Sequence, residues 1–212
     1  MFADRSDAGE RLAERLASED VSVDLVLAIP RGGLPLGRAV ADALDVPLDV
    51  VVAKKLGAPR NPEFAIGAVA SDGSTWYNEE AIDRLGVSGA YVRDEWQEQT
   101  VAARQKAATY RQGKRLGDLD GQAVAVVDDG VATGSTARAC LRQVREAGAD
   151  PLIFAVPVGP SDTVAELGAE ADRVICLDTP PDFRAVGQYY RSFDQVPDEE
   201  ALTYLDRDEA KM

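Results

Sequence analysis

The chain has 212 residues, with 37 Asp and Glu against 23 Lys and Arg, no histidine, and a formal net charge of -14. This acidity disfavours a general nucleic-acid surface, because the phosphates would be repelled. The absence of histidine removes Ser-His and Cys-His nucleophile systems and histidine-based metal sites. The length suits a single α/β domain that carries an insertion.

The composition also bears on the compartment. No apolar run is long enough to span a membrane, and residues 1–7 lack the basic start and apolar core of a signal peptide. We therefore expect a cytoplasmic protein with no membrane or nucleic-acid partner. Cys140 and Cys176 fall in expected helix and strand interiors, where cysteine usually serves as a small buried side chain. The dispersed acidity with few lysines suggests a salt-adapted, halophilic protein, and an ordinary acidic protein is the alternative.

The first quarter of the chain alternates helical and extended patterns. In order we expect a helix over 7–19, a strand over 24–29, a helix over 34–44 and a strand over 48–53. The loop Pro30-Arg31-Gly32-Gly33 follows the first strand, and Lys54 and Lys55 follow the second. Two lysines at the edge of a sheet in an acidic chain favour an anionic ligand. One of the pair is expected to point to solvent, and the sequence does not say which.

The middle of the chain reads as an insertion. The loop-like stretch 57–62 precedes two short antiparallel strands, 64–70 and 74–77, and helices are expected over 78–85 and 88–110. A basic cluster gathers around the end of the last helix: Arg104, Lys106, Arg111, Lys114 and Arg115. The cluster either reaches a bound anion or forms a solvated helix end that complements the helix dipole, and both interpretations stay open.

The most informative stretch runs from Val124 to Cys140. It begins with the apolar run 124–127, typical of a strand buried on both faces, and continues with the carboxylates Asp128 and Asp129. A small, hydroxyl-rich loop follows, and a helix is expected over 137–147. Free N–H groups at a helix start bind phosphate, whereas adjacent carboxylates suit sugar hydroxyls or Mg²⁺. The stretch therefore predicts a ligand with a phosphate at one end and a diol or metal beside it.

The remaining elements complete the alternating pattern. We expect a strand over 152–157, a helix over 161–167 and a strand over 173–177, followed by a tail with several aromatic residues. The chain lacks the Gly-Lys-Ser/Thr end of a P-loop, and no Gly-x-Gly-x-x-Gly follows a strand, so neither of those nucleotide-binding motifs applies.

Residues 124–136 resemble the signature of the type I phosphoribosyltransferases, in which an apolar strand, two acidic residues and a Gly or Ala precede Thr-Gly-x-Thr. The resemblance implies that phosphoribosyl pyrophosphate (PRPP) is the substrate. Asp128 and Asp129 would contact its ribose hydroxyls and, indirectly through PRPP and water, Mg²⁺. The residues implied to hold its 5′-phosphate are Ala132, Thr133, Gly134, Ser135 and Thr136.

The same resemblance extends to the other loops. The residues implied to bind pyrophosphate are Pro30, Arg31, Gly32, Gly33, Lys54 and Lys55. The insertion corresponds to the mobile loop or hairpin that closes over the active site in this family. Phe183 and Tyr189 lie where the family has its acceptor hood, and either could stack on a flat heterocycle. Closing the core is the commoner role for such aromatic side chains.

The expected fold is α/β: a mainly parallel, doubly wound sheet with an antiparallel hairpin insertion and a small hood. A single domain would span 1–212, with the hairpin and helical insertion at about 57–115 and the hood at about 178–212. The layout resembles the uncharacterised stand-alone phosphoribosyltransferases of bacteria and archaea more than the purine or orotate enzymes.

The resemblance implies a Mg²⁺-dependent enzyme of nucleotide metabolism and nucleoside salvage. It would move the phosphoribosyl group of PRPP to a nitrogenous acceptor, a nucleobase first of all, and release pyrophosphate. The implied catalytic residues are Asp128, Asp129, Lys54 and Arg31, and the family usually forms homodimers. A non-catalytic PRPP- or nucleotide-sensing regulator is the alternative. A phosphate-ester hydrolase is disfavoured because the sequence offers no nucleophile system or metal-ligand cluster.

Overall fold

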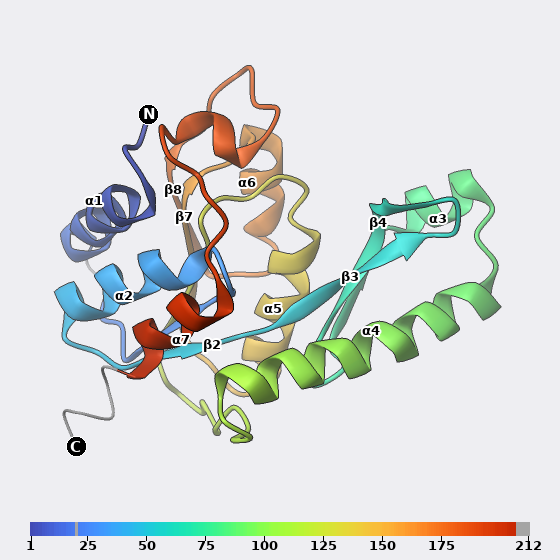
Figure 1. Cartoon of the computed structure of the whole chain (residues 1–212), viewed down its shortest axis with the longest axis horizontal. Coiled ribbons are helices and arrows are strands. Elements are labelled where there is room, and N and C mark those ends of the chain that lie inside the picture. The colour runs from blue at the N-terminus through green and yellow to red at the C-terminus, as the bar shows by residue number, and fades with distance from the viewer. Residues whose placement is uncertain (20, 207–212) are drawn as a thin grey trace.

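The computed structural model describes residues 1–19 and 21–206, and its centre is a five-stranded parallel sheet in the order β2-β1-β6-β7-β8 (Figure 1). The strands are Leu25–Ala28 (β1), Leu48–Val50 (β2), Val124–Val127 (β6), Leu152–Val158 (β7) and Arg173–Asp178 (β8). Their apolar, β-branched composition fits burial on both faces, as parallel sheets require. The parallel sheet and the mainly α/β class expected from the sequence are confirmed.

Helices cover both faces of this sheet. One core contains Leu12 and Leu16 of helix Arg5–Ser18 (α1) and Leu36 of helix Gly33–Leu44 (α2), packed on alternate residues of the strands. The other core contains Leu141 of helix Ser135–Glu146 (α5) and Leu167 of helix Ser161–Leu167 (α6), packed on the intervening strand residues. Because successive side chains of a strand point to opposite faces, one apolar strand supplies both cores.

The chain reverses its winding direction between β1 and β6. From β1 it crosses through α2 to β2, which lies on one side of β1, and from β6 it crosses through α5 to β7 on the other side. The two strands are parallel neighbours, with Ala28 opposite Val127, so their carboxyl ends lie side by side. In open α/β sheets ligands bind in the crevice outside the carboxyl ends at such a switch point.

A second, antiparallel sheet forms most of an arm, residues 53–110, that projects from the parallel sheet (Figure 1). Its strands are Ala53–Ala58 (β3), Asn61–Ala70 (β4) and Thr75–Tyr77 (β5), and its helices are Glu79–Leu85 (α3) and Gly89–Tyr110 (α4). The arm has its own small core of Leu56, Ala58, Ile66 and Val69. Tyr91 and Trp96 of α4 pack against that core, so the long helix is joined to the sheet along its first half.

The strand expected over 48–53 is wrong, because the chain leaves one sheet for the other within it. Val51 still donates its N–H to Ala28 of β1, whereas the carbonyl of Val52 accepts from Ser71 beyond β4. The stretch 57–62, expected to be a loop, contains the end of β3 and the start of β4. A continuous apolar run does not reveal a change of hydrogen-bonding partner, which explains both errors.

Several element ends also differ from expectation. Helix α1 begins at Arg5 because the Asp4 side chain accepts hydrogen bonds from the N–H groups of Ser6 and Asp7. Helix α5 begins at Ser135 rather than at 137. In the tail, a 3₁₀ turn at Val186–Tyr189 and a helix at Asp198–Asp206 (α7) were not predicted. Cys140 is buried in α5 and Cys176 is half-buried in β8, both as free thiols.

Among residues 1–19 and 21–206, the structure has no helix whose length and apolar character would allow it to cross a membrane.

The separate core of the arm predicts that the arm opens independently of the parallel sheet. Ile66→Ala removes a fully buried side chain from that core, at a cost of about 2–5 kcal/mol. We expect faster hydrogen exchange in β3, β4 and the first half of α4, with β6 and β7 protected as in the wild type. Leu141→Ala, in the core between α5 and the parallel sheet, should instead lower protection throughout the molecule. Identical exchange patterns in the two variants would contradict an independent arm.

Candidate active site

The carboxylates Asp128 and Asp129 directly follow β6 at the switch point, where two distant segments, the start of α1 and the tail, contact Asp129. The Oδ1 atom of Asp128 accepts a hydrogen bond of 2.8 Å from the N–H of Asp129. The Nε atom of Arg5, at the start of α1, lies 2.8 Å from Oδ2 of Asp129. The Tyr190 hydroxyl donates to the Asp129 carbonyl at 2.6 Å. The N-terminal helix and the tail therefore meet at the acidic pair.

This environment makes ionisation of both carboxyl groups costly. Burial raises the pKa of Asp128 well above its ordinary value, and the neighbouring Asp129 charge adds to the effect. Burial also raises the pKa of Asp129, while the charge and hydrogen bond of Arg5 partly oppose this rise. Two buried carboxylates in contact store unfavourable electrostatic energy that hydrogen-bond donors or a cation from a ligand would relieve.

The loop after β1 packs closely against the acidic pair, which explains its two glycines. A Cβ atom at Gly32 would lie 2.0 Å from Oδ2 of Asp129, and one at Gly33 would lie 2.6 Å from the Val127 carbonyl. Any side chain at either position would force the loop away from β6. Pro30, Arg31, Gly32 and Gly33 are thus brought together with Asp128 and Asp129, as expected for a site that joins the two loops.

On the other side of the acidic pair lies the loop of residues 132–136. Ala132 and Thr133 are exposed, and the hydroxyl of Thr163 in α6 holds the Ala132 carbonyl at 2.9 Å. Gly134 adopts the left-handed conformation (φ 74°), and α5 begins at the next residue. A glycine at the helix start offers no side-chain cap, so the N–H groups of the first turn are available to an anion. The loop and the helix dipole therefore suit a phosphate.

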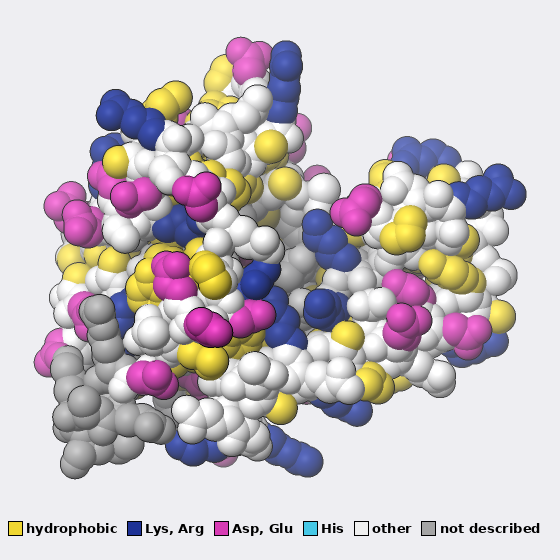
Figure 2. All heavy atoms as spheres, viewed as in Figure 1, with side chains coloured by type: hydrophobic (Ala, Val, Ile, Leu, Met, Phe, Trp, Pro, Cys, Tyr) yellow, Lys and Arg dark blue, Asp and Glu magenta, His cyan; other side chains and the backbone are white. Residues whose placement is uncertain are grey.

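Cations gather on the opposite side, where the arm meets the sheet. Lys106 of α4 donates a hydrogen bond of 2.7 Å to the Pro30 carbonyl. Burial lowers the pKa of Lys106, and the charges of Lys54 and Arg31 lower it further. Figure 2 shows Lys and Arg side chains gathered in the hollow between the arm and the main body. Mutual repulsion of this kind favours binding of an anion among the three cations.

The structure separates the roles of the two adjacent lysines. Lys54 and Lys55 lie in β3, not beyond a strand of the parallel sheet, and neighbouring residues of a strand point to opposite faces. Lys55 is exposed, whereas Lys54 is half-buried and lies near enough to Lys106 to affect its pKa. Lys54 therefore belongs to the cation group at the loop, and Lys55 does not share that face.

Three residues at the site could not be assigned to it from the sequence: Lys106, Arg5 and Asp198. Lys106 belongs to the basic cluster at the end of α4, but it is the member of that cluster that contacts the Pro30 loop. Asp198 of α7 lies 3.5 Å from Arg31 and accepts a 2.6 Å hydrogen bond from the Tyr110 hydroxyl. Neither Arg5 nor Asp198 belongs to a motif, so only the tertiary structure could place them.

The aromatic residues of the tail pack as a hood beside the acidic pair. Phe183 and Tyr189 stack on each other, with ring centroids 5.6 Å apart and planes 11° from parallel. Both are half-buried against the core that contains α1 and α2. Between them, Val186 lies so close to Gly130 that a Cβ atom there would be 2.6 Å from its Cγ1 atom. The hood therefore covers the chain immediately after Asp129.

The residues at this edge fit a metal only together with a ligand. Among the described residues, no three His, Cys, Asp or Glu side chains group as a metal site. Mg²⁺ commonly binds through one or two carboxylates plus substrate phosphates and water. Asp128 and Asp129 could supply the carboxylates for such an arrangement, and a bound diphosphate would supply the remaining oxygens.

A family model described as "Phosphoribosyl transferase domain" matches residues 4–193. The chain belongs to this phosphoribosyltransferase family. The match covers both loops, the acidic pair, the arm and the hood as far as Phe193. It bears out the resemblance on which the type I assignment was based.

Relatives and solved structures agree with this assignment. A Mycobacterium tuberculosis protein named as a phosphoribosyl transferase is 42% identical over 207 residues, which are 98% of this chain and 47% of that protein. The chain thus spans about half the length of this curated relative. The solved structure of TT1426 from Thermus thermophilus is 40% identical, with a TM-score of 0.80 over 96% of this chain and 97% of the other. A hypoxanthine/guanine phosphoribosyltransferase of Methanocella paludicola is 24% identical over 80% of this chain and 70% of its own.

The raised pKa values predict a pH-dependent gain in stability when the acidic pair is neutralised. A carboxyl group whose pKa is raised by folding costs no stability below its ordinary pKa, and destabilises the fold as pH rises through the raised value. Asp128→Asn should therefore increase the free energy of unfolding at pH 7, on the order of 1 kcal/mol or more, with little change near pH 3. Urea unfolding at constant ionic strength measures this difference.

The exposed Asp94 in α4 provides the matched control for that experiment. Asp94→Asn should leave the stability difference near zero at both pH values. A loss of stability at pH 7 in Asp128→Asn, or a gain that does not shrink in acid, would contradict the electrostatic account of the pair.

Proposed function

We propose that this protein transfers the 5-phosphoribosyl group of PRPP to a nitrogenous acceptor, with release of pyrophosphate. One observation carries the proposal: a buried acidic pair at the switch point is flanked by a phosphate-binding type of loop on one side and by three cations on the other. This order of groups matches PRPP itself, in which a ribose diol lies between a 5′-phosphate and a pyrophosphate.

Each part of the substrate has a suitable partner. Asp128 and Asp129 accept hydrogen bonds from the ribose hydroxyls, which relieves the cost of burying them. The N–H groups and hydroxyls of Ala132, Thr133, Gly134, Ser135 and Thr136 hold the 5′-phosphate. Pyrophosphate binds to the loop Pro30, Arg31, Gly32 and Gly33, with Lys54 and Lys106 supplying charge; Lys55, first expected in this set, lies on the outer face of β3.

In the reaction the bond from C1 of the ribose to the pyrophosphate oxygen breaks, and pyrophosphate leaves with the electron pair. A bond forms from C1 to the acceptor nitrogen, which releases a proton to solvent. The transition state resembles an oxocarbenium ion, as in sugar transfers generally. Lys54, Lys106 and Arg31 stabilise the charge that develops on the departing pyrophosphate. Closure of the arm over the site would exclude water and prevent hydrolysis of PRPP.

We infer that Mg²⁺ accompanies PRPP. When bound, the ion would neutralise the pyrophosphate and polarise its bond to the sugar. Asp128 and Asp129 are the residues of this chain that would orient it, through PRPP oxygens and water molecules.

The acceptor belongs to the class of flat nitrogen heterocycles. Phe183 and Tyr189 form a stacked pair in the hood beside Asp129, and a nucleobase could extend that stack. Purines come first in the test panel because the Methanocella paludicola relative is named for hypoxanthine and guanine. A role in nucleotide metabolism, with salvage of bases, follows from this proposal.

We also propose three properties expected from the sequence: the enzyme is cytoplasmic, it assembles as a homodimer, and it is adapted to salt. The net charge of -14 supports the last of these, because salt would screen the repulsion among acidic side chains. The activity assay is therefore run both in dilute buffer and in concentrated KCl. Full stability in dilute buffer would contradict salt adaptation and leave the proposed reaction unaffected.

Replacement of both acidic residues tests the core of the proposal. Asp128→Asn with Asp129→Asn keeps the shape of the pair but removes its charge, so kcat/KM for PRPP should fall on the order of 10²–10³-fold while the fold remains intact. The measurement is pyrophosphate release with Mg²⁺ and a panel of purine and pyrimidine bases. Wild-type turnover in the double variant would exclude the assigned role, and PRPP binding without turnover by the wild type would favour a sensor.

Lys106 provides an independent test, because its role was not evident from a motif. Lys106→Gln should raise KM for PRPP about tenfold, the loss expected for one charge-assisted contact. Because its pKa is lowered, PRPP affinity in the wild type should begin to fall at a pH below the ordinary lysine value, and this fall should be absent from the variant. Arg84→Gln, an exposed change in α3, is the matched control. Unchanged KM and pH profile in Lys106→Gln would remove Lys106 from the site.

A further inference from the structure

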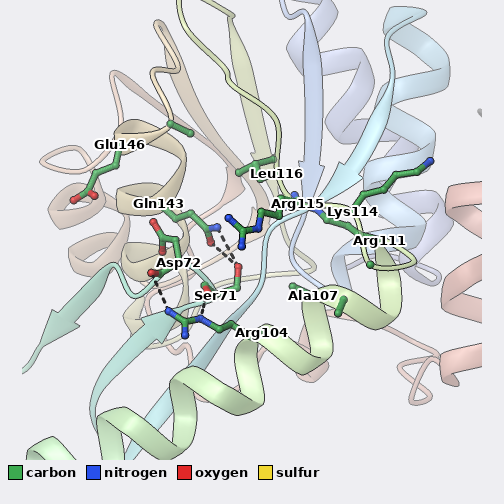
Figure 3. Close-up of a pocket in the computed structure, with 13 residues that line it drawn as sticks. Ser71, Asp72, Arg104, Ala107, Arg111, Lys114, Arg115, Leu116, Gln143 and Glu146 are labelled. Atoms are coloured by element: carbon green, nitrogen blue, oxygen red, sulfur yellow. Dashed lines mark hydrogen bonds between the residues drawn. The ribbon is translucent and has the colours of Figure 1, made fainter.

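A cavity of about 740 Å³ lies between α4 and α5 (Figure 3). It is enclosed by the second half of α4, the second half of α5, the turn after β4 and the segment after α4. Its polar and charged lining residues are Ser71, Asp72, Arg104, Arg111, Lys114, Arg115, Gln143 and Glu146. The volume falls in the range typical of small-molecule sites.

The cavity is separate from the proposed PRPP site. Glu146 lies eleven residues after Ser135 along α5, about 16 Å at the rise of an α-helix, so the 5′-phosphate loop is at the other end of that helix. On α4, Arg104 lines this cavity, whereas Lys106 is two residues further along and projects at about 200° from Arg104. Helix α4 therefore presents one cationic face to the Pro30 loop and another to this cavity.

Cationic side chains dominate the cavity although the chain as a whole is strongly acidic. Four cations line it against the two carboxylates of Asp72 and Glu146. Arg104 is fixed by the Ser71 carbonyl at 3.0 Å and the Asp72 carbonyl at 3.5 Å. Arg111 is buried and bound to Asp49 at 3.0 Å and to the Val50 carbonyl. Asp49 therefore neutralises Arg111, whereas Arg104 is held by carbonyl groups alone and keeps its charge for an anionic ligand.

Arg115 adds a cation that the protein itself does not neutralise. Within residues 1–19 and 21–206, Arg115 forms no ion pair and no hydrogen bond. Figure 3 shows its guanidinium group inside the cavity, directed towards Ser71 and Gln143. A cation that faces a cavity without a protein partner is well placed to bind an anionic ligand.

The rest of the lining suits a nucleoside. The apolar residues Ala107, Ala108, Leu116 and Ala147 also line the cavity, and the three alanines leave room for a ring. The Gln143 amide donates to the Ser71 hydroxyl at 3.1 Å, so this polar pair is already ordered. The carboxylates of Asp72 and Glu146 repel phosphate but accept hydrogen bonds from sugar hydroxyls or amino groups.

We propose that this cavity is a second ligand site, which binds a phosphorylated nucleoside with its phosphates on Arg104 and Arg115 and its ring beside the apolar lining residues. Helix α4 connects the occupant to the other site, because the same helix places Lys106 on the Pro30 carbonyl. The proposal concerns binding and does not depend on the chemistry assigned to the first site.

The test is calorimetric titration of the full chain with ATP and GTP. Arg115→Glu should weaken binding about tenfold or more, because it replaces one charge-assisted contact with repulsion. The matched control is Arg93→Glu, which makes the same change at an exposed position near the start of α4. Thr133→Ala with Thr136→Ala reports whether the nucleotide instead occupies the 5′-phosphate loop.

Weakened binding in Arg115→Glu, with wild-type affinity in the Arg93 and threonine variants, would support the second site. Three results would overturn it: no binding of either nucleotide by the wild type, equal binding by wild type and Arg115→Glu, or loss of binding in the threonine variant alone. Pyrophosphate release by the same samples measures the first site separately, so failure of one proposal is distinguishable from failure of the other.

Discussion

The structure depends on the burial of two adjacent carboxylates at the carboxyl edge of a parallel sheet. Burial strips both carboxyl groups of hydration and raises both pKa values, and the charge of Asp129 raises the pKa of Asp128 further. Arg5 offsets part of this cost through its ion pair with Asp129, while Tyr190 holds the Asp129 carbonyl and the glycines after β1 let the first loop pack against the pair. The N-terminal helix, the first loop and the hood therefore meet at the acidic pair.

The directions of the cationic side chains on α4 are a second constraint on where anionic ligands can bind. Lys106 faces the Pro30 loop, and Arg104 faces the cavity beside α5. Packing against β3 and β4 fixes the rotation of the helix and hence the direction of each cation. One helix therefore contributes to both proposed ligand sites, and movement of the arm would affect both.

The arm and the parallel sheet differ in how much buried apolar area stabilises them. The sheet holds the acidic pair and the loops rigidly, because its strands are buried on both faces by separate helical layers. The arm has only a small core of its own and supplies two of the three cations, Lys54 and Lys106. A ligand site that must open for substrate and close against water benefits from this unequal distribution of buried apolar area.

The sequence by itself determined the α/β class, the order of most elements, and the acidic pair with its phosphate-type loop, because these depend on local periodicity and on residues adjacent in the chain. It could not determine that residues 48–53 divide between two sheets, since an apolar run does not specify its hydrogen-bonding partner. Only the tertiary structure brought Arg5, Lys106 and Asp198 to the site, and it alone separated Lys54 from Lys55. These residues are far apart in the chain, and their roles arise from helix rotation and long-range packing, which no local pattern encodes.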